Sequence, residues 1–180
     1  NSSIVSISKD KKNIYIAVTI DEGDKFSIGK IKLKGDIPEK LSFAELEKEL
    51  TVTEGDVFNR SKINESTSNI TKVMGNFGYA FANVSSVPTI DMEKQRVNFT
   101  FFADKGKKIY VRRINILGNE KTKDQVIRRE LRQFESSWFA QDKINRSKTR
   151  LTRTQFFDTV DIETPTVPGV SDQIDLNIKV

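Results

Sequence analysis

The side chains that most often perform chemistry in proteins are missing from this chain, because its 180 residues include neither histidine nor cysteine. Histidine-dependent triads, thiol nucleophiles, disulfides and metal sites built on imidazole or thiolate are therefore excluded. Carboxylate pairs and serine–lysine pairs remain, but no spacing in the sequence favours them. We predict that the protein is not an enzyme, carries no cofactor or metal, and uses its charged side chains for binding.

The positive charge is concentrated in the C-terminal part of the chain. Residues 1–106 contain 15 basic and 15 acidic side chains, whereas residues 107–180 contain 15 and 10. Near-helical spacing predicts one basic helix face, which is made of Lys143, Arg146, Arg150 and Arg153. This face is suited to an anionic membrane surface or to a protein partner. The alternative is a helix surface that simply faces water.

The segments that position these residues occur twice in the sequence. Apolar, glycine and turn residues between positions 14 and 35 recur 83 positions later, and those between 46 and 70 recur 81 positions later. The second match includes Lys62-Ile63-Asn64, which returns as Lys143-Ile144-Asn145. A unit of about 80 residues is the size of a small domain, so we predict a tandem array. The domains are residues 23–104 and 105–180, and residues 1–22 are the C-terminal hairpin of a truncated preceding domain.

The sequence predicts the same order of elements in each full repeat: strand, helix, helix, strand, strand. In the first, strands at 26–34, 81–89 and 96–102 surround a helix with the capping box Ser42–Glu45 and a second helix capped by Ser61. In the second, strands at 109–117, 157–164 and 173–180 surround a helix with a capping box at 122–125 and a helix capped by Asp142. The expected fold class is α+β, with a three-stranded mixed sheet covered on one face by two helices. The pattern leaves open which strand the first one flanks.

The second strand of each repeat is expected to be an open sheet edge. Pro88 and Pro165 lie at the far ends of these strands, and proline is tolerated only at a strand edge. An open edge can accept an extended segment of another chain through backbone hydrogen bonds. The candidate client-binding residues are Val84, Ser85, Ser86, Val87, Thr159, Val160, Asp161, Ile162 and Glu163. The alternative is that Asp161 and Glu163 discourage such pairing.

Several segments resemble one known family. They are Val111–Asn119, Val126–Glu130, Val167-Pro168-Gly169 and Gly78–Phe81. With the repeated β-α-α-β-β order, the chain resembles POTRA domains, namely the fourth and fifth of an outer-membrane protein assembly factor. The resemblance implies the periplasm of a Gram-negative bacterium and a membrane-embedded barrel that follows Val180. It also implies accessory lipoproteins and unfolded outer-membrane proteins as partners, and no nucleic acid.

The same resemblance points to a docking site for a lipoprotein. Glu130 lies in the Arg-Arg-Glu segment of the family, with Arg128, Arg129 and Arg132 beside it on the first helix of the second repeat. We expect Glu130→Lys to weaken capture of a lipoprotein without changing the melting temperature. The alternative is a surface network between charges of the same helix.

Two other functions stay open at this point. The chain resembles POTRA regions of other transport or secretion proteins as well, although these should lack the Arg-Arg-Glu and Val-Pro-Gly segments. Gly75-Asn76-Phe77-Gly78 has the G-x-x-G form of the loop in RNA-binding KH domains. That loop should lie between two helices, whereas this segment follows the second helix and belongs to the near-neutral repeat.

Overall fold

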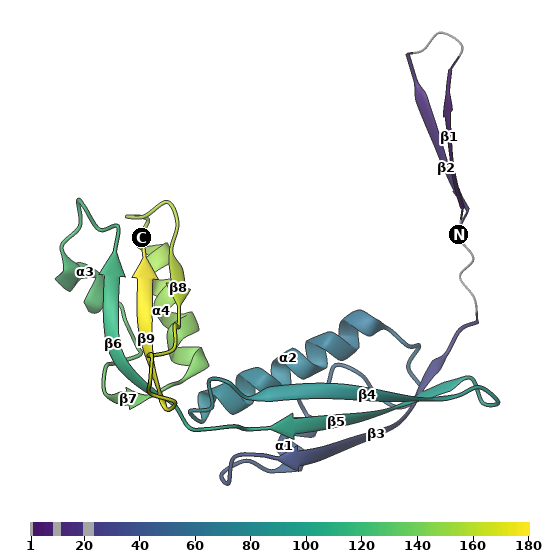
Figure 1. Ribbon diagram of the computed structural model, residues 1–180, viewed down its shortest axis with the longest axis horizontal. Coiled ribbons are helices and arrows are strands. Elements are labelled where there is room, and N and C mark those ends of the chain that lie inside the picture. The colour runs from purple at the N-terminus through teal and green to yellow at the C-terminus, as the bar shows by residue number, and fades with distance from the viewer. Residues whose placement is uncertain (1, 9–11, 20–23) are drawn as a thin grey trace.

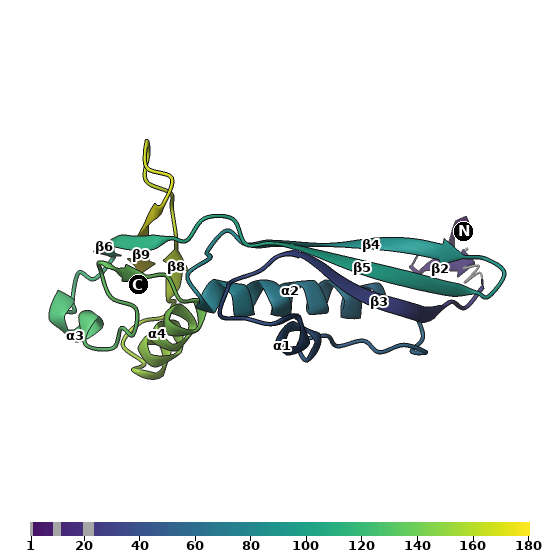
Figure 2. The same cartoon turned by 90° about the horizontal axis from the view of Figure 1, so that it is seen from below.

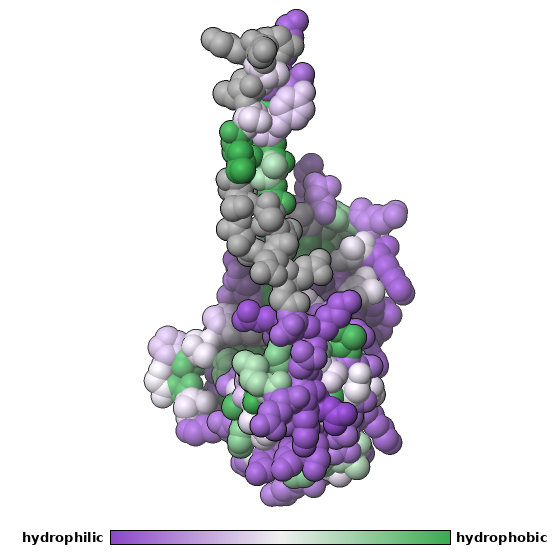
Figure 3. Space-filling view, turned by 90° about the vertical axis from the view of Figure 1, so that its right-hand side faces the viewer, coloured by the Kyte–Doolittle hydropathy of each residue, from purple (hydrophilic) through white to green (hydrophobic). Residues whose placement is uncertain are grey.

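The computed structural model describes residues 2–8, 12–19 and 24–180. Its first strands, β1 (Ser2–Ile7) and β2 (Ile14–Thr19), form an antiparallel hairpin that is a sheet of its own. Its apolar side chains Ile4, Val5, Ile14, Ile16 and Val18 are exposed, and part of the hairpin is green in Figure 3. The hairpin agrees with the strand pair predicted near the N-terminus, while residues 1, 9–11 and 20–22 of that predicted segment lie outside the described residues.

The first full repeat is a sheet with its helices on one face (Figures 1 and 2). Its elements are β3 (Ser27–Asp36), α1 (Phe43–Glu47), α2 (Arg60–Asn76), β4 (Asn83–Asp91) and β5 (Arg96–Asp104). The strand order is β3-β5-β4, with β3 parallel and β4 antiparallel to β5. The first strand therefore flanks the third, and the second strand is an edge, as predicted.

The second repeat has the same order of elements with one addition. Its elements are β6 (Tyr110–Leu117), α3 (Asp124–Arg128), β7 (Ser137–Trp138), α4 (Gln141–Arg153), β8 (Asp161–Glu163) and β9 (Gln173–Lys179). The strand order is β7-β6-β9-β8. The α+β class with mixed sheets is confirmed. The count of three strands is wrong for this repeat, because the two-residue β7 pairs with the start of β6.

Each repeat has its own hydrophobic core between sheet and helices. On β5 every second residue is buried, so that Val97, Phe99 and Phe101 face α2. Ile70 and Met74 of α2 meet them and are fully buried. Burying a side chain of this size contributes roughly 1.5–3 kcal/mol. In the second repeat, Ile174, Leu176 and Ile178 of β9 meet Ile144 and Leu151 of α4 in the same way.

A buried serine ties the two helical segments together in both repeats. In the first, the Ser66 hydroxyl accepts a hydrogen bond from the Thr51 N–H at 3.0 Å and donates to the Lys62 carbonyl at 2.9 Å. In the second, the Ser147 hydroxyl accepts from the Arg132 N–H at 2.8 Å and donates to the Lys143 carbonyl at 2.7 Å. Both serines are fully buried. In both repeats, the hydrogen bond from the backbone N–H to the serine hydroxyl therefore holds the segment after the first helix against the second helix.

A second duplicated contact fills the bulge in the first strand of each repeat. The Lys30 N–H donates to the Asn98 side chain at 2.7 Å, at the register shift between β3 and β5. At the matching shift between β6 and β9, Asp175 accepts from the Arg113 backbone and from the Arg112 guanidinium, with Nε–Oδ1 at 2.8 Å. The Arg112 partner holds the pKa of Asp175 below its usual range. In both sheets, a side chain of the neighbouring parallel strand, Asn98 of β5 or Asp175 of β9, thus accepts a hydrogen bond from the backbone at the bulge.

Local capping signals predicted one helix start correctly and three incorrectly. The Ser42–Glu45 capping box is present. Asn59, and not Ser61, caps α2, since the Asn59 side chain accepts from the Ser61 N–H at 2.9 Å. The box at 122–125 is absent, because the cap residue of α3 is Lys123, which makes no side-chain capping bond. Asp142 lies inside α4, whose cap residue is Ala140.

The cap of α4 comes from the other repeat. The Asn76 Oδ1 at the end of α2 accepts the Asp142 N–H at 2.8 Å. Next to it, a Cβ added at Gly75 would lie 3.4 Å from the Gln141 Cβ, and the Ile109 N–H donates to the Gly78 carbonyl at 2.8 Å. The two repeats therefore meet at a packed joint, where α2 and α4 are neighbours (Figures 1 and 2). Gly75 and Asn76 belong to α2, so the G-x-x-G segment is not a loop between two helices. The alternative prediction of a KH-like RNA-binding module is therefore wrong.

Candidate partner-binding surface

Glu130 joins α4 to the segment that follows α3. Its carboxylate oxygens lie 2.6 Å from Nη2 of Arg150 and 3.3 Å from Nε of Arg129, and its side chain is only 16% exposed. The predicted placement on a helix is wrong for Arg129, Glu130 and Arg132, because α3 ends at Arg128 and Arg129 is its C-cap. Glu130 thus forms an ion pair with Arg150, which lies 20 positions further along the chain on another helix. The alternative of a charge network confined to one helix does not account for this pair.

Arg128 is used inside the repeat. Its Nε donates to the Asp124 carboxylate at 2.9 Å, and its Nη2 donates to the Ile114 carbonyl at 3.0 Å. The Glu135 carboxylate accepts the Ile114 N–H at 2.8 Å and lies 3.5 Å from Nη1 of Arg128. Asp124 and Glu135 raise the pKa of Arg128 above its usual range. The side chains of Arg128 and Glu135 therefore hydrogen-bond the carbonyl and the N–H of Ile114, next to the short stretch of β6 that pairs with β7. These backbone groups of β6 are not free to pair with a strand of another chain.

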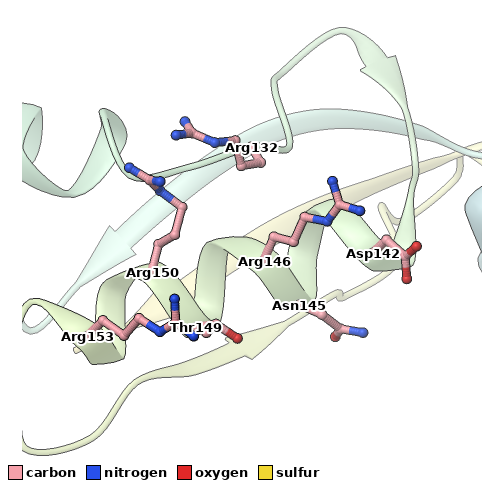
Figure 4. A pocket seen from close by; sticks show the side chains of 7 residues that line it. All are labelled: Arg132, Asp142, Asn145, Arg146, Thr149, Arg150 and Arg153. Carbon is pink, nitrogen blue, oxygen red and sulfur yellow. The ribbon is translucent and has the colours of Figure 1, made fainter.

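Four arginines line one hollow, which we call the arginine hollow. Its volume is about 540 Å³, and it is lined by Arg132, Asp142, Asn145, Arg146, Thr149, Arg150 and Arg153. Arg132 approaches from the segment after α3, while the others extend from α4 (Figure 4). Ser147 holds the Arg132 backbone, and the Arg132 guanidinium donates to the Leu131 carbonyl at 3.2 Å. The structure thus joins Arg132 of the predicted docking residues with three residues of the predicted basic face; Lys143 is not among the lining residues.

The predicted client edges differ in length. β4 is an edge strand of nine residues that includes Val84–Val87, with Val84 turned towards the core and Val87 exposed. In the second repeat only Asp161, Ile162 and Glu163 form a strand, β8. Thr159 and Val160 precede it, and Val160 is buried, so their assignment to the edge is wrong. Asp161 pairs with Lys148 and Glu163 with Lys179, which places charges along this short edge.

The residue that sequence reasoning missed is Gln133. Its side chain is fully buried. Its Oε1 accepts the Ala140 N–H at 3.0 Å, and its Nε2 donates to the Ser137 hydroxyl at 2.8 Å and to the Trp138 carbonyl at 3.0 Å. These bonds shape the loop between α3 and α4 and hence place Arg132 against α4. The Ser66 and Ser147 match at the 81-residue spacing was a readable signal for the neighbouring contact, whereas Gln133 has no counterpart in the repeat pattern.

The structure limits two further classes of site. Within the described ranges, no helix is both long and apolar enough to cross a membrane. Among those same residues, no three acidic side chains are grouped so that they could hold a metal ion. What the geometry offers is a charged surface beside α4 and the open edge of β4.

The comparisons with known proteins all match the same family. The POTRA family model, described as "Surface antigen variable number repeat", matches residues 26–106 and again residues 109–180. The outer membrane protein assembly factor BamA of Neisseria meningitidis serogroup B is 38% identical over 174 residues, which are 97% of this chain and 22% of that protein. BamA of Buchnera aphidicola is 30% identical over 181 residues, or 100% of this chain and 29% of that protein. The chain therefore spans less than a third of the length of these relatives.

Solved structures give the same result. The crystal structure of Haemophilus influenzae BamA POTRA3-5 has a TM-score of 0.89 and 29% identity, covering 99% of this chain and 70% of the other. BamA from Haemophilus ducreyi lacking POTRA domains 1-3 has a TM-score of 0.72 and 33% identity, covering 86% of this chain and 29% of the other. Two consecutive POTRA repeats thus have the arrangement seen here.

Proposed function

Because this chain belongs to the POTRA family, we propose that it is the periplasmic region of an outer-membrane protein assembly factor and acts as a non-enzymatic scaffold. The observation that carries the proposal is similarity to BamA along nearly the whole chain, in sequence and in fold. The scaffold binds accessory lipoproteins and nascent outer-membrane proteins. Its two full repeats correspond to the fourth and fifth POTRA domains.

The lipoprotein docks on the second repeat around Glu130. The site includes Arg129, which is exposed, and Arg150, which Glu130 holds in place. A charge pair at the rim of an interface mainly sets orientation and association rate. Arg128 contributes less directly, because Asp124 and Ile114 already use its guanidinium.

Client segments pair with β4. This strand is long, lies at the sheet edge and carries exposed Val87 and Ile90. Pro88 cannot donate to a ladder, so its backbone faces away from β5, and alternation places Ser86 on the same outward side. Backbone pairing at this edge would accept many β-rich sequences.

The proposal is tested by capturing lipoproteins from a membrane extract on the immobilised chain. Glu130→Gln and Glu130→Lys should both weaken capture, the second more strongly. Since Glu130 bridges two arginines, Glu130→Lys should now also lower the melting temperature, in contrast to the expectation from sequence. Glu93→Lys, a reversal in the exposed β4–β5 turn, is the matched control. Equal capture by all four proteins would remove Glu130 from the docking site.

A further inference from the structure

We propose that the arginine hollow binds an acidic segment of the partner protein, whose carboxylates pair with Arg146 and Arg153. The inference rests on the proposed docking function and specifies the chemistry of the partner. Arg153 follows Arg146 by seven positions on α4, so their Cα atoms lie about 10 Å apart along the helix axis. The partner therefore presents two carboxylates at about this spacing.

The first support is that, among the described residues, three of the four arginines lack a counter-charge, and Arg146 and Arg153 are the two whose guanidinium groups are not already hydrogen-bonded. Arg150 pairs with Glu130, and the Arg132 guanidinium donates to backbone carbonyls. Among the residues that the structure describes, neither Arg146 nor Arg153 forms an ion pair. Both side chains line the hollow (Figure 4). The hollow therefore holds uncompensated positive charge that an anionic group can use.

The second support comes from the internal repeat. The positions that correspond to Arg132, Arg146, Arg150 and Arg153 at the 81-residue spacing are Thr51, Glu65, Asn69 and Lys72. The first repeat builds the same helices and sheet with these residues, so the fold does not require the arginines. Basic residues in the last turn of a helix also complement its dipole. That effect accounts for Arg150 and Arg153 but not for Arg146 in the middle of α4 or Arg132 outside it.

The shape of the hollow favours a protein carboxylate over a lipid headgroup. The arginines come from two elements and face a concave space, whereas a membrane would present a flat layer of phosphates. The Glu130–Arg150 pair, at 2.6 Å, shows that a carboxylate fits the guanidinium geometry here.

The test measures binding of a fluorescein-labelled helical peptide with two glutamates seven residues apart, by fluorescence anisotropy at low salt. Arg146→Gln/Arg153→Gln should weaken binding about tenfold, because it removes two exposed ion pairs. The control Lys62→Gln/Lys72→Gln removes the same charge from exposed positions on α2 and should leave binding unchanged.

Two comparisons decide against other ligands. A peptide of the same composition with adjacent glutamates, and vesicles of phosphatidylglycerol in phosphatidylcholine, should bind more weakly and respond less to Arg146→Gln/Arg153→Gln. Equal loss in the variant and its control, or a loss confined to vesicle binding, would overturn the proposal. If the arginine variant still captures lipoprotein while Glu130→Lys does not, the hollow is excluded from docking but the proposed function stands.

Discussion

The bond between Asn76 and Asp142 predicts that one side chain stabilises α4 from outside its own repeat. Ala140 offers no oxygen to the first turn of α4, so in Asn76→Ala the Asp142 N–H loses its protein acceptor. Replacing a capping asparagine by alanine costs about 0.5–2 kcal/mol. Because water can reach this N–H, we expect about 1 kcal/mol. For a chain of this length, that lowers the melting temperature by about 2–4 °C.

The same change should loosen the joint between the repeats. Since the chain contains no cysteine, Glu65→Cys on α2 and Thr149→Cys on α4 allow selective spin labelling. Pulsed electron paramagnetic resonance should give a broader distance distribution between the two labels in Asn76→Ala. Asn64→Ala, a matched truncation at an exposed position of α2, should change neither the distribution nor the melting temperature.

Two results would refute this reasoning. If Asn76→Ala and Asn64→Ala melt alike with equally narrow distance distributions, the capping bond contributes nothing to α4 or to the joint. If Asn76→Ala melts lower but keeps the narrow distribution, the cap stabilises α4 while the other contacts of the joint, among them the Ile109–Gly78 hydrogen bond and the packing of Gly75 on Gln141, hold the repeats together. The predicted coupling requires both changes together.

Three further predictions follow from individual contacts. Gln133→Ala should lower the free energy of unfolding by about 3 kcal/mol in urea titrations, because it leaves buried backbone groups without partners, whereas exposed Gln125→Ala should have little effect. Arg112 lowers the pKa of Asp175, so this stabilisation is present above about pH 4 and is lost as pH falls through the folded-state pKa; urea titrations of Asp175→Asn should show a shallower loss of stability on acidification. Ser86→Pro should weaken binding of an extended client peptide at unchanged circular dichroism, and unaltered binding would exclude the β4 edge.

The sequence by itself determined the repeated architecture. Period-two alternation and helical stripes depend only on which face of an element is buried, so they indicate strands and helices without knowledge of neighbours. The 83- and 81-residue matches then showed that one fold occurs twice, and Pro88 indicated the edge position of β4. The Ser66 and Ser147 match was readable in the same way but acquires meaning only from the bonds they make.

Only the tertiary structure decided which charges are free to bind. Glu130 meets Arg150, and Arg132 faces α4, because buried Gln133 and Ser147 fold the intervening loop back onto that helix. No local spacing encodes contacts between residues so far apart in the chain. The predicted cap of α4 was wrong for a related reason. The side chain that accepts a hydrogen bond from its first turn is Asn76, which belongs to the other repeat. A binding surface made of several segments depends on how those segments pack, whereas each segment's own conformation follows from its local pattern.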